Sequence, residues 1–262
     1  MMRLKAPAVA RGSRPGQFIH VQCAGETLLR RPFSLLDADP KLGTIDFIYK
    51  VVGLGTGALA QIPAGSKVDL LGPLGRPFEF PDDLKAAYLV GGGVVIPPLV
   101  LLAKRLLEKR VSVVAFLGAR TKDWVICVPQ FRKMGIPVHV ATDDGSLGYK
   151  GSVVSLLQAV IERKSLTPFA LSLSKGGHSP RNDVMLYICG PTPMMAAAAA
   201  LARRGRIPAQ VSLEERMGCA MGCCVGCVVE VGTEPVTSHK RFQRVCTEGP
   251  VFPAEAIAWK SA

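Results

Sequence analysis

The chain has 262 residues, of which 48% are hydrophobic and 20% charged, a balance that allows a sizeable core and excludes a disordered polypeptide. Its 32 Lys and Arg against 20 Asp and Glu give a formal net charge of +12. The excess lies in residues 83–205, which carry 16 basic and 7 acidic side chains with few aromatic residues between them. This pattern favours a phosphorylated small molecule or an acidic partner and argues against binding of a nucleic acid.

Neither an export signal nor a membrane span is expected. Residues 1–17 contain no apolar h-region, as a signal peptide would. The longest apolar stretch, residues 89–103, is interrupted by Gly and Pro and falls short of the ~20 residues that a spanning helix needs. The eight cysteines are therefore expected to be buried thiols or metal ligands in the cytoplasm.

Residues 1–82 are expected to form a small antiparallel β-barrel. Short segments of β-branched or alternating apolar residues are separated by Gly and Pro, and no long helix is indicated. The expected strands are residues 18–22, 28–29, 44–52 and 67–71.

Residues 83–205 are expected to form a parallel α/β domain, because apolar strands alternate with helical segments. The expected strands are residues 86–90, 111–118, 138–142 and 184–189, and the expected helices are residues 98–109, 153–162 and 192–203. Such sheets bind nucleotides at the carboxyl ends of their strands. Residues 165–183, rich in Ser, Gly, Pro and Lys, are interpreted as a surface insertion. Residues 206–262 are expected to form a third domain, in which two or three short strands surround a cysteine-rich segment, too small to build a core unless it is docked or metal-bound.

The cysteine spacing is the strongest chemical signal in the sequence. Cys219, Cys224 and Cys227 stand as C-x4-C-x2-C, and Cys246 follows further along the chain. This is the plant-type ferredoxin spacing for a [2Fe–2S] cluster. The glycines interleaved with these cysteines permit a tight wrap and leave amide N–H groups free to point at sulfur.

A structural zinc site is the alternative for the same cysteines. Zinc sites prefer two C-x2-C pairs, and Cys246 has no such neighbour, which favours the cluster. Cys223 adjoins a ligand and is interpreted as a bystander.

Two glycine-rich turns are candidates for binding phosphate. The glycines at 91–93 follow a strand and precede a helix, as in a dinucleotide turn, and the segment 53–57 (GLGTG) could also receive a phosphate. The segment 30–34 (RRPFS) offers a fork of donors beside an aromatic ring. The same residues can be explained without a ligand. The glycines at 91–93 could be a tight connection, the segment 53–57 a hairpin loop and the arginines at 30–31 surface residues, so the pattern alone leaves nucleotide binding open.

Taken together, these segments resemble the electron transfer subunits of NAD-dependent dihydroorotate dehydrogenase B, over nearly the whole chain and in the same order. The segments that carry the resemblance are LLRRPFS (28–34), IYKVVGLGTGAL (48–59), LLGPLGRPF (70–78), YLVGGGVVIPPL (88–99), VATDDGSLGYKG (140–151), YICGPTPMM (187–195), LEERMGCAMGCCVGC (213–227) and RVCTEGPVF (244–252).

The resemblance implies a ferredoxin reductase-like fold with an FAD-binding β-barrel, an NAD-binding α/β domain and a C-terminal [2Fe–2S] domain. It assigns FAD to Arg31, Pro32, Phe33, Ser34, Ile48, Tyr49, Lys50, Gly55 and Thr56. It assigns NAD to Gly92, Gly93, Cys189 and Gly190, and the cluster to Cys219, Cys224, Cys227 and Cys246. Val95 stands where the turn in the family has its second glycine, and a side chain there could crowd the pyrophosphate.

The implied function is electron transfer between NAD and the FMN of a catalytic dihydroorotate dehydrogenase subunit, in a heterotetramer with two copies of each subunit. No residue of this chain is expected to act on dihydroorotate itself. Flavin subunits of hydrogenase, sulfite reductase and transhydrogenase complexes share the three modules and are the alternative.

Overall fold

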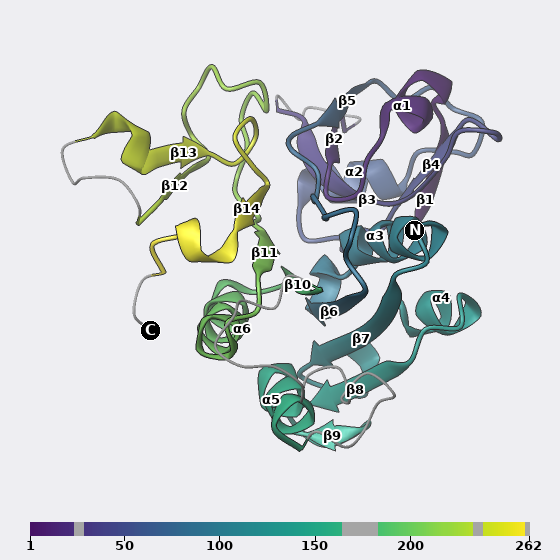
Figure 1. Ribbon diagram of the computed structural model, residues 1–262. Helices are drawn as coiled ribbons and strands as arrows, with labels where there is room; N and C mark the ends of the chain where they lie inside the picture. The colour runs from purple at the N-terminus through teal and green to yellow at the C-terminus, as the bar shows by residue number, and fades with distance from the viewer. Residues whose placement is uncertain (24–28, 164–182, 233–237, 260–262) are drawn as a thin grey trace.

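The computed structural model describes residues 1–23, 29–163, 183–232 and 238–259. They form a five-stranded sheet, a seven-stranded sheet and a two-stranded sheet (Figure 1). Except for Asp183, the insertion expected at 165–183 lies outside the described residues.

The N-terminal sheet is antiparallel, with the order β1-β4-β3-β2-β5. Its strands are β1 Met2–Lys5, β2 Phe18–Val21, β3 Arg31–Asp39, β4 Thr44–Phe47 and β5 Leu70–Leu74, and its helices are α1 Pro7–Gly12 and α2 Leu54–Ala60. Among the described residues, the edge strands β1 and β5 do not pair with each other. The expected antiparallel domain is present, but strand pairing in these ranges does not close it into a continuous barrel.

Several expected boundaries in this domain were wrong. Leu29 is not in a strand, and strands β1 and β3 were not predicted; β3 begins at Arg31 and pairs with β2. The strand expected to reach residue 52 ends at Phe47, after which the chain leaves the ladder. The glycine-rich segment expected to be a turn opens into α2, which begins at Leu54.

The seven-stranded sheet has the order β14-β11-β10-β6-β7-β8-β9 and is parallel except for β14. Its strands are β6 Ala86–Gly92, β7 Ser112–Ala119, β8 Val138–Thr142, β9 Tyr149–Lys150, β10 Val184–Cys189, β11 Ala209–Ser212 and β14 Val251–Pro253. The α-helices around it are α3 Pro97–Glu108, α4 Val128–Lys133, α5 Val153–Arg163 and α6 Thr192–Gly205. Among the described residues, four 3₁₀ turns lie C-terminal to the first sheet: Gly93–Val95, Lys122–Trp124, His239–Arg241 and Ala254–Ala256.

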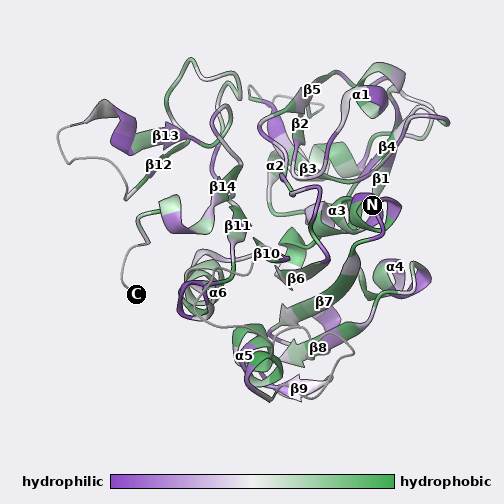
Figure 2. Ribbon diagram, in the orientation of Figure 1, coloured by the Kyte–Doolittle hydropathy of each residue, from purple (hydrophilic) through white to green (hydrophobic). Residues whose placement is uncertain are grey.

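Helices cover both faces of this sheet, which explains why its central strand is apolar throughout. Along β6, Tyr88 and Val90 pack in the cluster that includes α5 and α6. Ala87 and Leu89 pack in the cluster that includes α3 and α4. Figure 2 shows the hydrophobic colour concentrated on these inner strands and helices. A strand buried on both faces carries no polar alternation.

Helix α3 joins the two larger sheets. Leu99 and Leu102 pack in the core of the seven-stranded sheet, whereas Leu101 packs in the core of the N-terminal sheet. Lys104 adds an ion pair with Asp37 of β3, with 3.0 Å between Nζ and Oδ1. The N-terminal domain is thereby packed against a helix that covers one face of the parallel sheet.

The C-terminal region leaves the large sheet and returns to it. The chain departs after Ser212, forms the two-stranded sheet of β12 (Val228–Glu230) and β13 (Phe242–Arg244), and re-enters at Val251. Ser212 pairs with Val251, and the Leu213 N–H donates to the Pro250 carbonyl at 2.9 Å. Residues 213–250, the C-terminal excursion, therefore leave the sheet and return to it at neighbouring strands, and both ends of this cysteine-rich region are anchored at the edge of the sheet.

Candidate functional site

A cleft of about 870 Å³ lies where the N-terminal domain, the start of α3 and the segment after β11 meet. Ligand pockets commonly have volumes of ~300–1,000 Å³, so a cofactor fits a hollow of this size. The residues expected to bind flavin all line the cleft except Gly55: Arg31, Pro32, Phe33, Ser34, Ile48, Tyr49, Lys50 and Thr56. The rest of its wall consists of Phe18, Leu29, Val52, Val94, Val95, Pro97, Pro98, Leu213, Glu214, Glu215, Arg216, Met217 and Pro250.

Arg31 and Gly55 lie against each other although they are far apart in the sequence. A Cβ on Gly55 would lie 3.3 Å from Arg31 Nε, closer than ordinary van der Waals contact. Arg31 Nη1 donates to the carbonyl oxygen of Leu29 at 2.6 Å, which holds the guanidinium at the edge of the cleft. A guanidinium held in this way presents further donors of the kind that bind phosphate oxygens in pairs.

Aromatic packing fixes the floor of the cleft. The ring of Phe33 stacks on Phe47 with centroids 5.0 Å apart and lies 5.4 Å from Tyr49. Lys50 lines the cleft, and its Nζ lies 4.1 Å from the ring centroid of Trp124, beyond the end of β7. Such contacts reduce the rotamer freedom of Tyr49 and Lys50 before any ligand binds.

Thr56 is held by its own loop at the start of α2. Its Oγ1 accepts a hydrogen bond from the Val52 N–H at 2.9 Å. The hydroxyl therefore braces the loop that forms one rim of the cleft.

The expected NAD residues meet at the carboxyl ends of β6 and β10. A Cβ on Gly92 would lie 2.5 Å from Met194 Sδ, and a Cβ on Gly190 would lie 2.9 Å from the same sulfur. At both positions a Cβ would meet the end of the Met194 side chain, so the two glycines leave room for that side chain. Gly93 has a φ of +61° and open space where a side chain would be.

Cys189 and Val95, close to these glycines in the chain, are both buried. The Cys189 thiol is fully buried and interacts with the Ser212 carbonyl, and burial raises the pKa of the thiol. Val95 lies within the 3₁₀ turn and lines the cleft of about 870 Å³. The contact of NAD with Gly92, Gly93, Cys189 and Gly190 stays a prediction.

The segment 213–217 forms a wall of the cleft that the sequence reasoning did not predict. It follows directly on β11, so Glu214, Glu215 and Arg216 stand at the carboxyl end of a strand in the parallel sheet. Short strands were expected in residues 206–262, but this one was not located because only Ala209–Ser212 pair there. Recognition of a strand before the LEERM segment would have indicated this wall.

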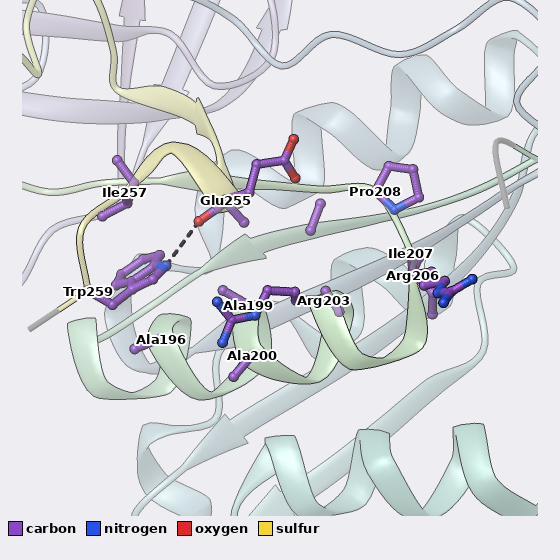
Figure 3. Close-up of a pocket in the computed structure, with 13 residues that line it drawn as sticks. Ala196, Ala199, Ala200, Arg203, Arg206, Ile207, Pro208, Glu255, Ile257 and Trp259 are labelled. Atoms are coloured by element: carbon purple, nitrogen blue, oxygen red, sulfur yellow. Dashed lines mark hydrogen bonds between the residues drawn. The ribbon is translucent and has the colours of Figure 1, made fainter. Parts of the chain in front are cut away.

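A second hollow, of about 660 Å³, lies on the outer side of α6 (Figure 3). Small side chains such as Ala196, Ala199 and Ala200 form its base, and the C-terminal segment borders it. Trp259 Nε1 donates to the carbonyl oxygen of Ala254 at 3.0 Å, which holds the indole at the rim. The residues expected to bind FAD, NAD or the cluster do not line this hollow.

The cluster cysteines lie in two pairs in the C-terminal excursion. Cys224 donates its backbone N–H to Cys219 Sγ at 3.4 Å, and the Cys227 and Cys246 thiols interact with each other. Cys227 and Cys246 are buried, whereas Cys224 is exposed. A two-iron cluster is held by two protein ligands at each iron, so two pairs fit this requirement.

Backbone amides are directed at one of these sulfurs. Hydrogen bonds from the N–H groups of Cys224 and Met221 lower the pKa of Cys219 to about 6. Burial and the neighbouring Cys227 raise the pKa of Cys246 to about 11. Thiolates are the form that binds iron. Within the described ranges, no three His, Cys, Asp or Glu side chains converge to hold a single metal ion, so the assignment of the cluster ligands stays a prediction.

Two family models match the chain. Residues 1–79 match the oxidoreductase FAD-binding domain, and residues 214–258 match the iron–sulfur cluster binding domain of dihydroorotate dehydrogenase B. The dihydroorotate dehydrogenase B (NAD(+)) electron transfer subunit of Desulforamulus reducens is 38% identical, over 99% of this chain and 92% of its own length. The corresponding subunit of Bacillus caldolyticus is 43% identical, over 93% and 86%.

The chain belongs to this family. The family resemblance and the fold class predicted from the sequence are thereby confirmed, as are an FAD-binding domain and an iron–sulfur domain. A solved structure of an NADH-dependent reduced ferredoxin-NADP oxidoreductase, studied for flavin-based electron bifurcation, is also similar. It has a TM-score of 0.79 at 31% identity and is matched over 98% of this chain and 84% of that one. Among the described residues, no helix of this family member is long and apolar enough to cross a membrane.

Proposed function

We propose that this chain transfers electrons between NAD and the catalytic subunit of a dihydroorotate dehydrogenase, with FAD in the cleft and a [2Fe–2S] cluster on its cysteines. The observation that carries the proposal is the shared segment 213–219. Residues 213–217 line the cleft, and Cys219 follows two residues later at the start of the cysteine loop. The chain thus holds two redox sites on one short, anchored segment.

The residues of the N-terminal domain are proposed to bind and orient FAD. Arg31 supplies paired donors for the diphosphate, beside Gly55 and Thr56 at the rim. Pro32, Phe33 and Ser34 on β3 form one wall of the cleft, and Ile48, Tyr49 and Lys50 form the adjoining one. These contacts determine which face of a bound flavin is open toward the α/β domain.

Gly92 and Gly93, together with Cys189 and Gly190, are proposed to bind the dinucleotide. These residues lie at the carboxyl ends of neighbouring parallel strands, where nucleotides bind in such sheets. Val95, at the turn after β6, lines the cleft proposed for FAD, so a dinucleotide bound here would approach the flavin from the sheet side.

The cysteine loop is proposed to hold one iron on Cys219 and Cys224 and the other on Cys227 and Cys246, in line with their pairing. When bound, FAD would accept or donate either two electrons together or one at a time, and the cluster would carry single electrons. The protein positions these groups and excludes water from the buried pair.

We propose the same division of the chain as the sequence predicted, into residues 1–82, 83–205 and 206–262. Strands β11 and β14 belong to the third part by sequence and pair in the sheet of the second. As an electron transfer subunit, the chain works with a catalytic partner. We further propose an FMN-containing partner, a heterotetramer with two copies of each subunit, and a cytoplasmic location.

Absorption spectra and metal analysis of anaerobically purified protein test the cofactors. We expect flavin absorbance near ~450 nm with a broader iron–sulfur envelope, and iron and sulfide in equal amounts. A colourless protein that contains zinc would contradict the proposal and favour a structural metal site.

The similarity to the ferredoxin-NADP oxidoreductase structure favours a second candidate, a flavin subunit of another complex. Affinity purification of the tagged chain from its native cells separates the two. Recovery of a dihydroorotate-oxidising flavoprotein supports the first candidate. Recovery of a ferredoxin-dependent, hydrogenase or sulfite reductase subunit in its place would contradict it.

A further inference from the structure

The side chain of Arg244 joins the two segments that carry the cluster cysteines. Its Nη1 donates to the carbonyl oxygen of Gly222 at 3.0 Å, in the loop between Cys219 and Cys224. Its Nε and Nη2 donate to the two carboxylate oxygens of Glu248, at 2.9 and 2.5 Å. The guanidinium thus connects the cysteine loop to the turn that follows β13.

The backbone around this contact is closely fitted. Gly222 has a φ of +83°, and a Cβ there would lie 3.1 Å from Arg244 Nη1 and 3.0 Å from Thr247 Cγ2. The Arg244 N–H donates to Glu248 Oε2 at 2.7 Å, and the Glu248 N–H donates to the Arg244 carbonyl at 2.9 Å. Because Glu248 holds both the backbone and the fork of Arg244, the guanidinium has little freedom to turn away from the loop.

The contact orients a peptide bond toward sulfur. In a trans peptide the C=O and N–H groups point in opposite directions. With the Gly222 carbonyl directed at Arg244, the N–H of Cys223 points to the other side, toward the sulfur of Cys219. It stands in the chain between the amides of Met221 and Cys224, which both donate to that sulfur at 3.4 Å.

The charge of Arg244 acts in the same direction as the amides. Arg244 stands two residues before Cys246 in the chain, and its Nη1 contacts the loop between Cys219 and Cys224. The guanidinium therefore lies beside both segments that carry the cysteines. Amide dipoles and positive charge near the sulfurs favour the reduced state of an iron–sulfur cluster, because it carries one more negative charge.

We propose that Arg244 is a positioning residue that raises the reduction potential of the cluster, by orienting the Gly222–Cys223 peptide and holding a positive charge beside the cysteines. The proposal rests on the proposed function, in which the four cysteines hold a [2Fe–2S] cluster. It makes Arg244 a determinant of how readily the cluster accepts an electron, in addition to its part in the fold.

The same domain contains a matched control. Arg241 Nε donates to Glu230 Oε1 at 2.7 Å, and Nη2 donates to the same oxygen. This pair resembles Arg244–Glu248 in type, but it braces β12 rather than the loop that carries Cys219. Arg241→Gln therefore removes an equivalent ion pair from the same domain without touching the cluster loop.

The experiment compares wild type, Arg244→Gln, Arg244→Lys and Arg241→Gln as full-length holoprotein. Iron and sulfide analysis measures cluster content, and a redox titration followed by electron paramagnetic resonance measures the potential. We expect Arg244→Gln to keep its cluster and to disfavour the reduced form at least tenfold, a fall of about 59 mV for one electron. Arg244→Lys keeps the charge without the fork and is expected to lie between Arg244→Gln and wild type. Arg241→Gln is expected to match wild type.

A wild-type potential in Arg244→Gln would overturn the proposal, as would an equal shift in Arg241→Gln. Loss of the cluster from both Arg244 variants would show a purely structural role and would also overturn it. If only Arg244→Gln loses the cluster, a lowered potential in Arg244→Lys supports the proposal and an unchanged potential contradicts it. Absence of a cluster from the wild-type protein would refute the proposed function itself, which separates that failure from the others.

Discussion

Arg31→Ala tests the placement of FAD most directly. Arg31 lines the cleft, and its guanidinium is held over Gly55 by the Leu29 carbonyl. A hydrogen bond to a charged partner contributes about 1.5–3 kcal/mol. At ~1.4 kcal/mol for each tenfold change, we expect FAD to bind roughly 10- to 150-fold more weakly, as measured by titration of FAD into deflavinated protein.

Arg30→Ala provides the matched control for Arg31. Arg30 is the preceding residue, but its Nη2 pairs with Asp69 at 2.6 Å and it does not line the cleft. Gly55→Ala should give a smaller loss than Arg31→Ala, because its Cβ would only displace the guanidinium by tenths of an ångström. Unchanged FAD affinity in Arg31→Ala, or a larger loss in Arg30→Ala, would refute the placement.

Other substitutions test the remaining sites. Cys246→Ser should abolish the cluster and keep FAD, whereas Cys223→Ser should keep both, as iron, sulfide and flavin analysis will show; loss of flavin from Cys246→Ser would contradict separate sites. Gly92→Ala places a Cβ 2.5 Å from Met194 Sδ, so NADH titration should show weaker binding with FAD content unchanged. Unaltered NADH affinity would count against the proposed dinucleotide site. Burial lowers the pKa of His20 below its usual value of 6.5, so the unfolded state binds the proton more readily than the folded state. The contribution of the neutral His20 side chain to stability is therefore present above pH ~6.5 and lost below it. We expect His20→Leu to flatten the pH dependence of the denaturant midpoint between pH 7.5 and 5.5. A pH dependence of the midpoint equal to that of wild type would contradict this.

The central strands could be predicted from sequence because burial on both faces leaves an unbroken apolar run. Residues 184–189 were expected as a strand and form β10 with those bounds, buried throughout. Residues 138–142 form β8 with the expected bounds, although its first three residues are only half-buried. Strand β3 was missed because Arg31 and Pro32, where it begins, do not have a strand composition, and its partner β2 determines it. Short strands were expected after Arg206, but β11 could not be located because only pairing with β10 and β14 defines it.

The candidate site was predictable where chemistry depends on residue type and spacing. The cysteine pattern specifies thiolate ligands, and the flavin segments could be transferred one residue at a time from the family. The wall formed by residues 213–217 could not be predicted, because its position depends on where β11 ends in the sheet. The contact of Arg244 with Gly222 likewise depends on the fold of the excursion, since 22 positions separate the two residues.

The attachment of the cysteine-rich region at both of its ends explains how one chain can hold the proposed flavin site and the proposed cluster site at a fixed spacing. Leu213 and Pro250 both line the cleft, and the Leu213 N–H donates to the Pro250 carbonyl at 2.9 Å. The N-terminal domain holds the same point, because the Arg76 N–H donates to the Gly249 carbonyl at 2.6 Å. The base of the cysteine loop is therefore attached to the large sheet and to the flavin domain at once. Because displacement of the loop base would also move a wall of the cleft, the fold itself would set the spacing between the proposed flavin site and the proposed cluster site.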